Sequence, residues 1–152
     1  MFKIVAGHCP AFCYNLFMNR KIFYKKALNF VKDKHKGQYR AGRVPVWFHL
    51  ARVSDLLKSV LEESGEGSAS EQFIISTSGL GHDILEDTKA TEKEVEAVFD
   101  RKGFQIIKGM TNSWGDKNVK PYVKQVAQAE EAVRLVKLAD LFDNHISVVY
   151  NL

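Results

Sequence analysis

The sequence predicts an all-α protein, a single compact bundle of about six or seven helices. At 152 residues the chain is long enough for one domain with a sizeable core. Apolar residues recur every three or four positions in several segments, the spacing of amphipathic helices. No segment shows a convincing alternation of apolar and polar residues, and there are no internal repeats. A helical bundle is therefore the expected architecture.

The first half of the chain contains three predicted helices. Residues 22–36 form the first, because Phe23, Ala27 and Phe30 share one face and the segment ends in a basic run before a glycine. A short loop, QYRAGRVP, separates it from a second amphipathic helix over residues 46–61. The loop ESGEGSAS follows, and a largely apolar helix is then expected over residues 71–85. Its composition predicts a central position in the bundle.

The second half contains shorter helices and one long one. Thr91 and Glu94 form a capping-box pattern that opens a helix running through Phe99. A short helix over residues 104–111 precedes the turn NSWGDKN, and Pro121 suits the first position of the next helix. The last helix is expected over residues 130–150, with apolar faces supplied by Val133, Val136, Leu138, Leu141 and Ile146.

The chain divides into residues 1–20, an N-terminal arm or helix, and residues 21–152, the main domain. The apolar start lacks the n-region and cleavage site of a signal peptide, and nothing is long enough to cross a bilayer. His8, Cys9 and Cys13 match no zinc spacing, and two cysteines suit a reduced, cytoplasmic setting. The last helix is still apolar where the sequence stops, which leaves open whether the domain lacks its final helices.

The net charge of +4 and the pI near 9.0 favour an anionic partner. A phosphorylated small molecule, nucleic acid and a membrane surface all suit such a charge. Nucleic-acid binding requires a basic stripe with interleaved aromatic residues, which FYKK and KDKHKGQYR provide only in small part. The same residues fit a phosphate-rich small ligand. We expect that ligand, rather than nucleic acid or a membrane, and leave oligomerisation open.

The segment GLGHDILEDT carries four ionisable side chains. On a continuous helix, Glu86 and Asp87 lie one turn after His82 and Asp83, so all four share one face. Carboxylates so near to each other repel unless a cation lies between them. Imidazole nitrogen together with carboxylate oxygen suits manganese, iron or zinc better than calcium. The alternative is a solvated helix end beside a turn.

Two further residues are out of place in their surroundings. His49 lies within a helix among Trp47, Phe48 and Leu50, and Asp140 lies in the apolar stretch of VKLADLFDN. A lone histidine in such a helix is usually a satisfied core residue, but an aspartate there is destabilising without a partner. Together with the adjacent pair His82-Asp83, they form a candidate four-ligand metal site.

The order His49, His82-Asp83 and Asp140 on an all-α chain resembles the H…HD…D pattern of the HD superfamily. The local sequence is similar to the hydrolase domain of RelA/SpoT proteins and the stand-alone small alarmone hydrolases. Four blocks carry this resemblance in the family's order: HKGQYRAGRVPVWFHL, GLGHDILEDT, GMTN and KLADLFDN. They span roughly residues 22–147.

The resemblance implies a single HD-type helical domain with a manganese-dependent activity. That activity is removal of the 3′-pyrophosphate from guanosine tetra- or pentaphosphate, which releases pyrophosphate and GDP or GTP. The roles carried over by position are metal ligation by His49, His82, Asp83 and Asp140, catalysis by Glu86 and Asp87, and substrate contact by Arg40, Asn144 and Ser147. Lys137 is open between pairing with a substrate phosphate and pairing with a ligand carboxylate.

The chain departs from the family's pattern at several basic positions. Ala41 replaces a lysine and Leu141 replaces a basic residue, while Leu50 replaces a proline. These changes leave the ligand set intact but reduce positive charge near the substrate. Two alternatives follow: an HD phosphohydrolase acting on another nucleotide or dinucleotide, and a catalytically weak nucleotide-binding sensor. His35 matches a position that is not a ligand, and a surface or helix-dipole role is expected for it.

Overall fold

The computed structural model describes the backbone of residues 10–113 and 119–150, and the side chains of residues 19–113 and 119–149. This part of the chain contains seven α-helices, a short 3-10 helix and no β-strand, which confirms the predicted all-α class. The elements are α1 (Pro10–Lys34), η1 (Ala41–Arg43), α2 (Val46–Ser64), α3 (Ala69–Gly81), α4 (Ile84–Asp87), α5 (Glu92–Met110), α6 (Val119–Ala127) and α7 (Glu131–Tyr150).

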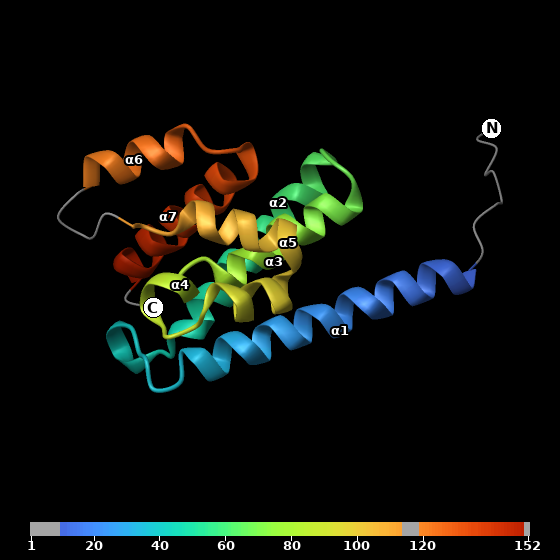
Figure 1. Ribbon diagram of the computed structural model, residues 1–152, viewed down its shortest axis with the longest axis horizontal. Coiled ribbons are helices and arrows are strands. Elements are labelled where there is room, and N and C mark those ends of the chain that lie inside the picture. The colour runs from blue at the N-terminus through green and yellow to red at the C-terminus, as the bar shows by residue number, and fades with distance from the viewer. Residues whose placement is uncertain (1–9, 114–118, 151–152) are drawn as a thin grey trace.

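Helix α3 lies at the centre of the bundle, where it contacts α1, α2, α5 and α7. The long helix α1 runs along one side, and α6 and α7 lie on the other (Figure 1). Because α2 contacts both α3 and α7, residues from three separate parts of the chain meet beside it. This arrangement confirms the expected central position of the largely apolar third helix.

Helix α1 begins earlier than the sequence indicated. It is continuous from Pro10 to Lys34, so residues 10–20 belong to the same helix instead of a separate arm. Residues 1–9 lie outside the described part, and with them His8 and Cys9; the side chain of Cys13 is also outside it. Ala27 and Val31, further along α1, are fully buried and attach the helix to the bundle.

Two apolar clusters make up the core. The first lies between α1, α2, α3 and α5; its buried members are Ala27, Val31, Leu50, Leu80, Ile84, Val95, Phe99 and Ile107. The second lies between α2, α5 and α7; its buried members are Val53, Leu57, Ile106, Met110, Val133, Val136 and Ala139. Helix α2 contributes to both clusters, so its position is fixed from two sides.

Helices α2 and α3 approach closely at Gly79. A Cβ atom added there would lie 3.1 Å from the backbone N and Cα of Ser54 and 2.9 Å from a methyl group of Leu57. Only a residue without a side chain permits this separation, because backbone atoms cannot move aside as a flexible side chain can. Glycine at this position therefore sets the spacing of the two helices.

The predicted helix over residues 71–85 is wrong in one respect: it is interrupted between Gly81 and Ile84. In a continuous helix the carbonyl of Gly79 would accept the N–H of Asp83. Here it accepts a hydrogen bond of 2.8 Å from Nδ1 of His82 instead. The short helix α4 then starts afresh, with the carbonyl of Asp83 accepting the N–H groups of Glu86 and Asp87.

Helix α5 combines the two predicted helices over residues 91–99 and 104–111. Asp100 marks the kink between them, with a positive φ of 59°. Its carboxylate accepts the N–H groups of Lys102 and Gly103, as an N-cap does for a new helix. The capping box of Thr91 and Glu94 is present at the start of α5, as predicted.

Helix α7 confirms the predicted last helix, but one of its faces differs from the prediction. Val133 and Val136 are buried, while Leu138 and Leu141 are 63% and 43% exposed.

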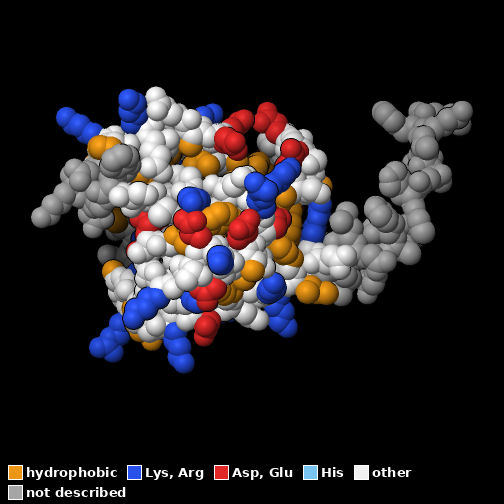
Figure 2. Space-filling view, in the orientation of Figure 1, with side chains coloured by type: hydrophobic (Ala, Val, Ile, Leu, Met, Phe, Trp, Pro, Cys, Tyr) orange, Lys and Arg blue, Asp and Glu red, His pale blue; other side chains and the backbone are white. Residues whose placement is uncertain are grey.

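Basic side chains on the face shown in Figure 2 are interspersed with acidic and apolar ones instead of forming a continuous stripe. Among the described residues, no helix has the length and apolar character needed to span a membrane.

Candidate metal centre and active site

Four predicted ligands come together where α2, α7 and the α3–α4 junction meet. Nε2 of His49 lies 3.2 Å from Oδ1 of Asp140 and 4.0 Å from Oδ2 of Asp83. Nε2 of His82 lies 3.1 Å from Oδ1 of Asp83 and 3.4 Å from Oδ1 of Asp140. Ligand atoms of His49, His82 and Asp83 all lie within 4.8 Å of one another.

The imidazole of His82 is completely buried, and its hydrogen bonding fixes its tautomer. Nδ1 must carry a proton, because it lies 2.8 Å from the carbonyl of Gly79, which can only accept. In the neutral ring Nε2 is then unprotonated, and it has no hydrogen-bond partner in the structure. A bare nitrogen and two carboxylate oxygens facing one another form a donor set suited to a divalent cation.

The orientation of His49 is fixed by a residue that the sequence did not single out. Nδ1 of His49 donates to Oδ2 of Asp143 at 2.6 Å, which leaves Nε2 directed toward Asp140. Arg52 donates to both oxygens of Asp143, at 2.7 and 2.9 Å. A carboxylate behind a histidine ligand is a common arrangement in metal sites, where it fixes the ring and increases its basicity.

Asp140 is surrounded by donors on both of its oxygens. Nζ of Lys137 lies 2.8 Å from Oδ2, and Nδ2 of Asn144 donates to Oδ1 at 2.6 Å. Of the two alternatives left open for Lys137, the structure therefore has it paired with a ligand carboxylate. Tyr122 lies next to it, with Nζ of Lys137 5.3 Å from the ring centroid.

Arg40 and Asn144, both predicted to contact substrate, are in direct contact. Nη2 of Arg40 donates to Oδ1 of Asn144 at 2.5 Å, across 104 positions of the sequence. Because Asn144 also donates to Asp140, a continuous chain of hydrogen bonds connects Arg40 with the ligand cluster. The two residues thus mark one side of the candidate site.

The electrostatics of the cluster favour positive charge within it. Burial alone raises the pKa of the Asp140 carboxyl, but hydrogen bonds with His49 and His82 bring it far below its usual range. Burial lowers the pKa of His82, yet the carboxylates of Asp83 and Asp140 raise it to about 10. Both shifts have one origin: the carboxylates stabilise a cation at this point, whether a proton or a metal ion.

The predicted catalytic pair lies beside the cluster, although not on a helical face continuous with His82. Oε1 of Glu86 accepts the backbone N–H of Asn112 at 2.7 Å. Partial desolvation of its carboxyl raises the pKa of Glu86, and the nearby charges of Asp83 and Asp87 raise it further. His82 is buried while Glu86 and Asp87 are exposed, so the predicted common stripe is wrong. The break before α4 is the reason.

Ser147 lies on the side of Arg52. Its buried hydroxyl oxygen accepts a hydrogen bond of 3.1 Å from Nη2 of Arg52. This contact gives Ser147 a part in holding the pair of Arg52 and Asp143, which the sequence did not indicate. Its contact with the ribose or a phosphate stays a prediction.

His35 is buried, so the expected surface role is wrong. Its Nδ1 lies 2.7 Å from Oε1 of Gln38, and Nε2 of Gln38 donates to the backbone carbonyl of Asp87 at 2.7 Å. The segment after α1 is thereby joined to the end of α4. A sequence signal for this relay was the block HKGQ, in which the two side chains lie three residues apart.

Comparison with known proteins finds relatives but no matching family model. A GTP pyrophosphokinase of Myxococcus xanthus is 30% identical over 132 residues, covering 79% of this chain and 16% of that protein. The guanosine-3′,5′-bis(diphosphate) 3′-pyrophosphohydrolase MESH1 of Danio rerio is 31% identical over 127 residues, covering 78% of this chain and 65% of that protein. The chain thus spans less than two thirds of the length of these relatives.

A solved structure has the same fold. It is described as a metazoan orthologue of SpoT that hydrolyses ppGpp; the TM-score is 0.68 at 22% identity, covering 84% of this chain and 71% of that one. The helices correspond although most side chains differ. The chain is thus similar in sequence to proteins named as guanosine-3′,5′-bis(diphosphate) 3′-pyrophosphohydrolases, and its fold matches that of a metazoan orthologue of SpoT.

Proposed function

We propose that this chain is a metal-dependent phosphohydrolase that removes the 3′-pyrophosphate of guanosine tetra- or pentaphosphate, releasing pyrophosphate and GDP or GTP. The observation that carries the proposal is the buried cluster in which Nε2 of His82, which has no hydrogen-bond partner, faces the carboxylates of Asp83 and Asp140. Relatives in Danio rerio and Borreliella burgdorferi that carry the name of this activity support it. A cytoplasmic setting is part of the same proposal.

We infer that His49, His82, Asp83 and Asp140 hold a divalent cation, and we propose Mn²⁺. Two imidazole nitrogens and two carboxylates suit manganese, iron or zinc better than calcium, which prefers oxygen ligands alone. When bound, such a cation lowers the pKa of water and polarises a phosphoryl oxygen. The chain's own residues supply the remaining steps.

The reaction requires one proton to move. A water oxygen forms a bond with the phosphorus attached to the 3′-oxygen, and the bond between this phosphorus and the 3′-oxygen breaks. The 3′-oxygen gains the proton that the water loses. Glu86 is placed to hold that proton, because partial desolvation and neighbouring carboxylates raise its pKa above the usual value. The N–H of Asn112 keeps one carboxylate oxygen in position. Asp87 is the second carboxylate of the proposed pair.

The substrate contacts in the proposal follow the hydrogen-bonded chain from the cluster outward. Arg40 presents a planar guanidinium that can stack on guanine, and its contact with Asn144 restrains it. Lys137 neutralises Asp140 and lies close enough to the cluster to meet a phosphate once the pair rearranges. Ser147 completes the proposed set from the same helix, α7.

The replacement of basic residues near the proposed substrate site supports two alternative functions. Leu141 is 43% exposed at a position where the family has a basic residue, so less positive charge surrounds the substrate. An HD enzyme for another nucleotide or dinucleotide, or a nucleotide sensor with little turnover, would tolerate this loss. The assay below distinguishes these outcomes from the main proposal.

The test is pyrophosphate release by the full chain supplied with Mn²⁺. Guanosine tetraphosphate, GTP and a dinucleotide are compared at equal concentrations, with EDTA-treated protein as the control. We expect pyrophosphate and GDP from guanosine tetraphosphate alone, and none after EDTA treatment. If only another nucleotide were hydrolysed, that nucleotide would replace guanosine tetraphosphate as the proposed substrate. Tight nucleotide binding without turnover would favour the sensor.

A further inference from the structure

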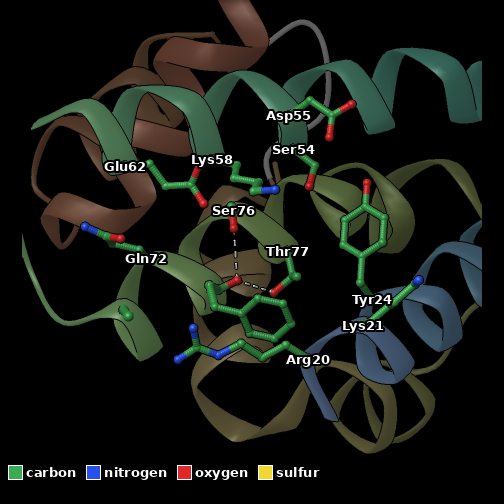
Figure 3. Close-up of a pocket in the computed structure, with 12 residues that line it drawn as sticks. Arg20, Lys21, Tyr24, Ser54, Asp55, Lys58, Glu62, Gln72, Ser76 and Thr77 are labelled. Carbon is green, nitrogen blue, oxygen red and sulfur yellow. Dashed lines mark hydrogen bonds between the residues drawn. The ribbon is translucent and has the colours of Figure 1, made fainter. Parts of the chain in front are cut away.

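A pocket lies on the opposite side of α2 from His49 and Arg52. It has a volume of about 380 Å³ and is lined by residues of α1, α2 and α3 (Figure 3). None of the residues predicted for the metal site or substrate lines it. Its size falls within the range of roughly 300–1,000 Å³ that is usual for small-molecule sites.

The floor of the pocket is polar and buried. Ser54, Ser76 and Thr77 are 1%, 5% and 3% exposed. The hydroxyls of Ser76 and Thr77 donate to the carbonyl of Phe73, at 3.1 and 2.7 Å, so their oxygen lone pairs remain available. A ligand with N–H groups can donate to this floor.

One wall is aromatic. Phe73 and Tyr24 both line the pocket, and Phe73 makes an edge contact with Phe23 that fixes its ring. The guanidinium of Arg20 lies 5.5 Å from the centroid of Phe73. A flat ring entering between these groups would gain stacking against both an aromatic face and a cation.

The rim carries charges of both signs. Arg20 and Lys21 approach from α1, while Lys58 approaches from α2 between Asp55 and Glu62 (Figure 3). Within the described part of the chain, none of these three cations is in an ion pair. Cations outside ion pairs suit a phosphate, and the carboxylates of α2 suit the hydroxyls of a sugar.

We propose that this pocket binds a phosphorylated nucleoside, with the base against Phe73, the phosphate between the cations of α1 and Lys58, and the ribose beside the carboxylates of α2. The aromatic wall and the acceptor floor fit the base, the cations of the rim fit the phosphate, and the carboxylates of the rim fit the ribose. The site is separate from the metal cluster, and its occupancy does not depend on the proposed hydrolysis.

The experiment is a titration of the isotopically labelled full chain, followed by backbone amide shifts. The probes are guanosine 5′-monophosphate, adenosine 5′-monophosphate and ribose 5-phosphate. We expect saturable shifts at Ser54, Phe73 and Thr77 with the nucleotides, and binding of ribose 5-phosphate at least about tenfold weaker, because it lacks the base. Equal affinity for ribose 5-phosphate would overturn the nucleoside assignment.

Charge reversal tests the rim without touching the core. Lys21→Glu with Lys58→Glu should weaken binding about tenfold or more, whereas the matched double variant Lys25→Glu with Lys93→Glu, also exposed, should bind as the unmodified chain does. The variant Arg40→Ala should retain these shifts. Unchanged affinity after reversal of the rim charges, or shifts confined to the surroundings of Arg40 and Asn144, would overturn the proposal.

Discussion

Asp143 accepts the Nδ1 proton of His49 at 2.6 Å while Arg52 donates to both of its oxygens, so a partly buried ion pair lies directly behind a candidate metal ligand. The pKa of Asp143 reflects this position: burial raises it, but Arg52 and His49 together lower it below the usual range. The carboxylate is therefore ionised and able to hold the imidazole with Nε2 facing the cluster.

Asp143→Asn should weaken metal binding by about 10- to 100-fold, the usual effect of removing a carboxylate behind a histidine ligand. The amide keeps the size of the side chain but loses the charge that fixes the tautomer of His49. Metal affinity is measured by competition with a chelating dye. Asp33→Asn, an exposed aspartate on α1, serves as the control. An unchanged affinity in folded Asp143→Asn would show that the contact is structural only.

The double variant Glu86→Gln with Asp87→Asn should lose turnover by at least about 100-fold while retaining metal, because neither residue is among the proposed ligands. Pyrophosphate release and metal content are measured on the same sample. Retained activity would mean that another group handles the proton. Loss of metal would instead place one of the two carboxylates in the ligand set.

Arg40→Ala should weaken binding of a guanine nucleotide about tenfold with little change in kcat, since stacking on the base acts equally in the bound and transition states. Arg40→Lys keeps the charge but not the planar guanidinium, and should not restore affinity. Binding and initial rates are measured in parallel. A fall in kcat with unchanged affinity would contradict the stacking role.

Glu94→Gln should lower the Tm at pH 7 and leave it nearly unchanged near pH 2. A 2.7 Å bond from Lys34, first among several hydrogen bonds, lowers the pKa of Glu94 from about 4.5 to about 2. Since the folded-state pKa lies below the unfolded one, this stabilisation is present above about pH 4.5 and is lost as the pH falls toward 2. Glutamine preserves the capping box, so the loss reports the charge alone.

The control for this experiment is Glu96→Gln, an exposed glutamate on the same helix that makes no ion pair within the described residues. Thermal unfolding of both variants is followed by circular dichroism between pH 2 and pH 7. An equal decrease at both ends of this range would contradict the electrostatic origin of the effect.

The all-α fold could be predicted from the sequence, and the proposed ligands could be singled out, because both depend on local patterns. Helical spacing predicted most of the helices, and His49 and Asp140 stood out because they lie among apolar neighbours. The break after Gly81 could not be predicted, since it depends on which donor reaches the carbonyl of Gly79. The spacing of apolar residues does not show whether this carbonyl accepts the backbone N–H of Asp83 or the imidazole N–H of His82.

The sequence did not indicate Asp143 and Arg52, for a different reason. Asp143 and Arg52 are charged residues on amphipathic helices, a composition typical of solvated faces, and only the packing of α7 on α2 brings them together. The same applies to His35, whose burial depends on the loop that follows α1. The converse error concerns Leu138 and Leu141, which are apolar and yet exposed. Burial is a property of the assembled bundle.

The glycine contact between α2 and α3 bears on the spacing of the proposed metal ligands. His49 is carried by α2, and His82 follows α3 with its ring bonded to the carbonyl of Gly79. A methyl group at this position would lie 3.1 Å from backbone atoms of Ser54, which cannot move aside. The gap between the two imidazoles thus depends on how closely two polypeptide backbones approach. A position that contributes no side chain thereby sets the spacing of two proposed ligands.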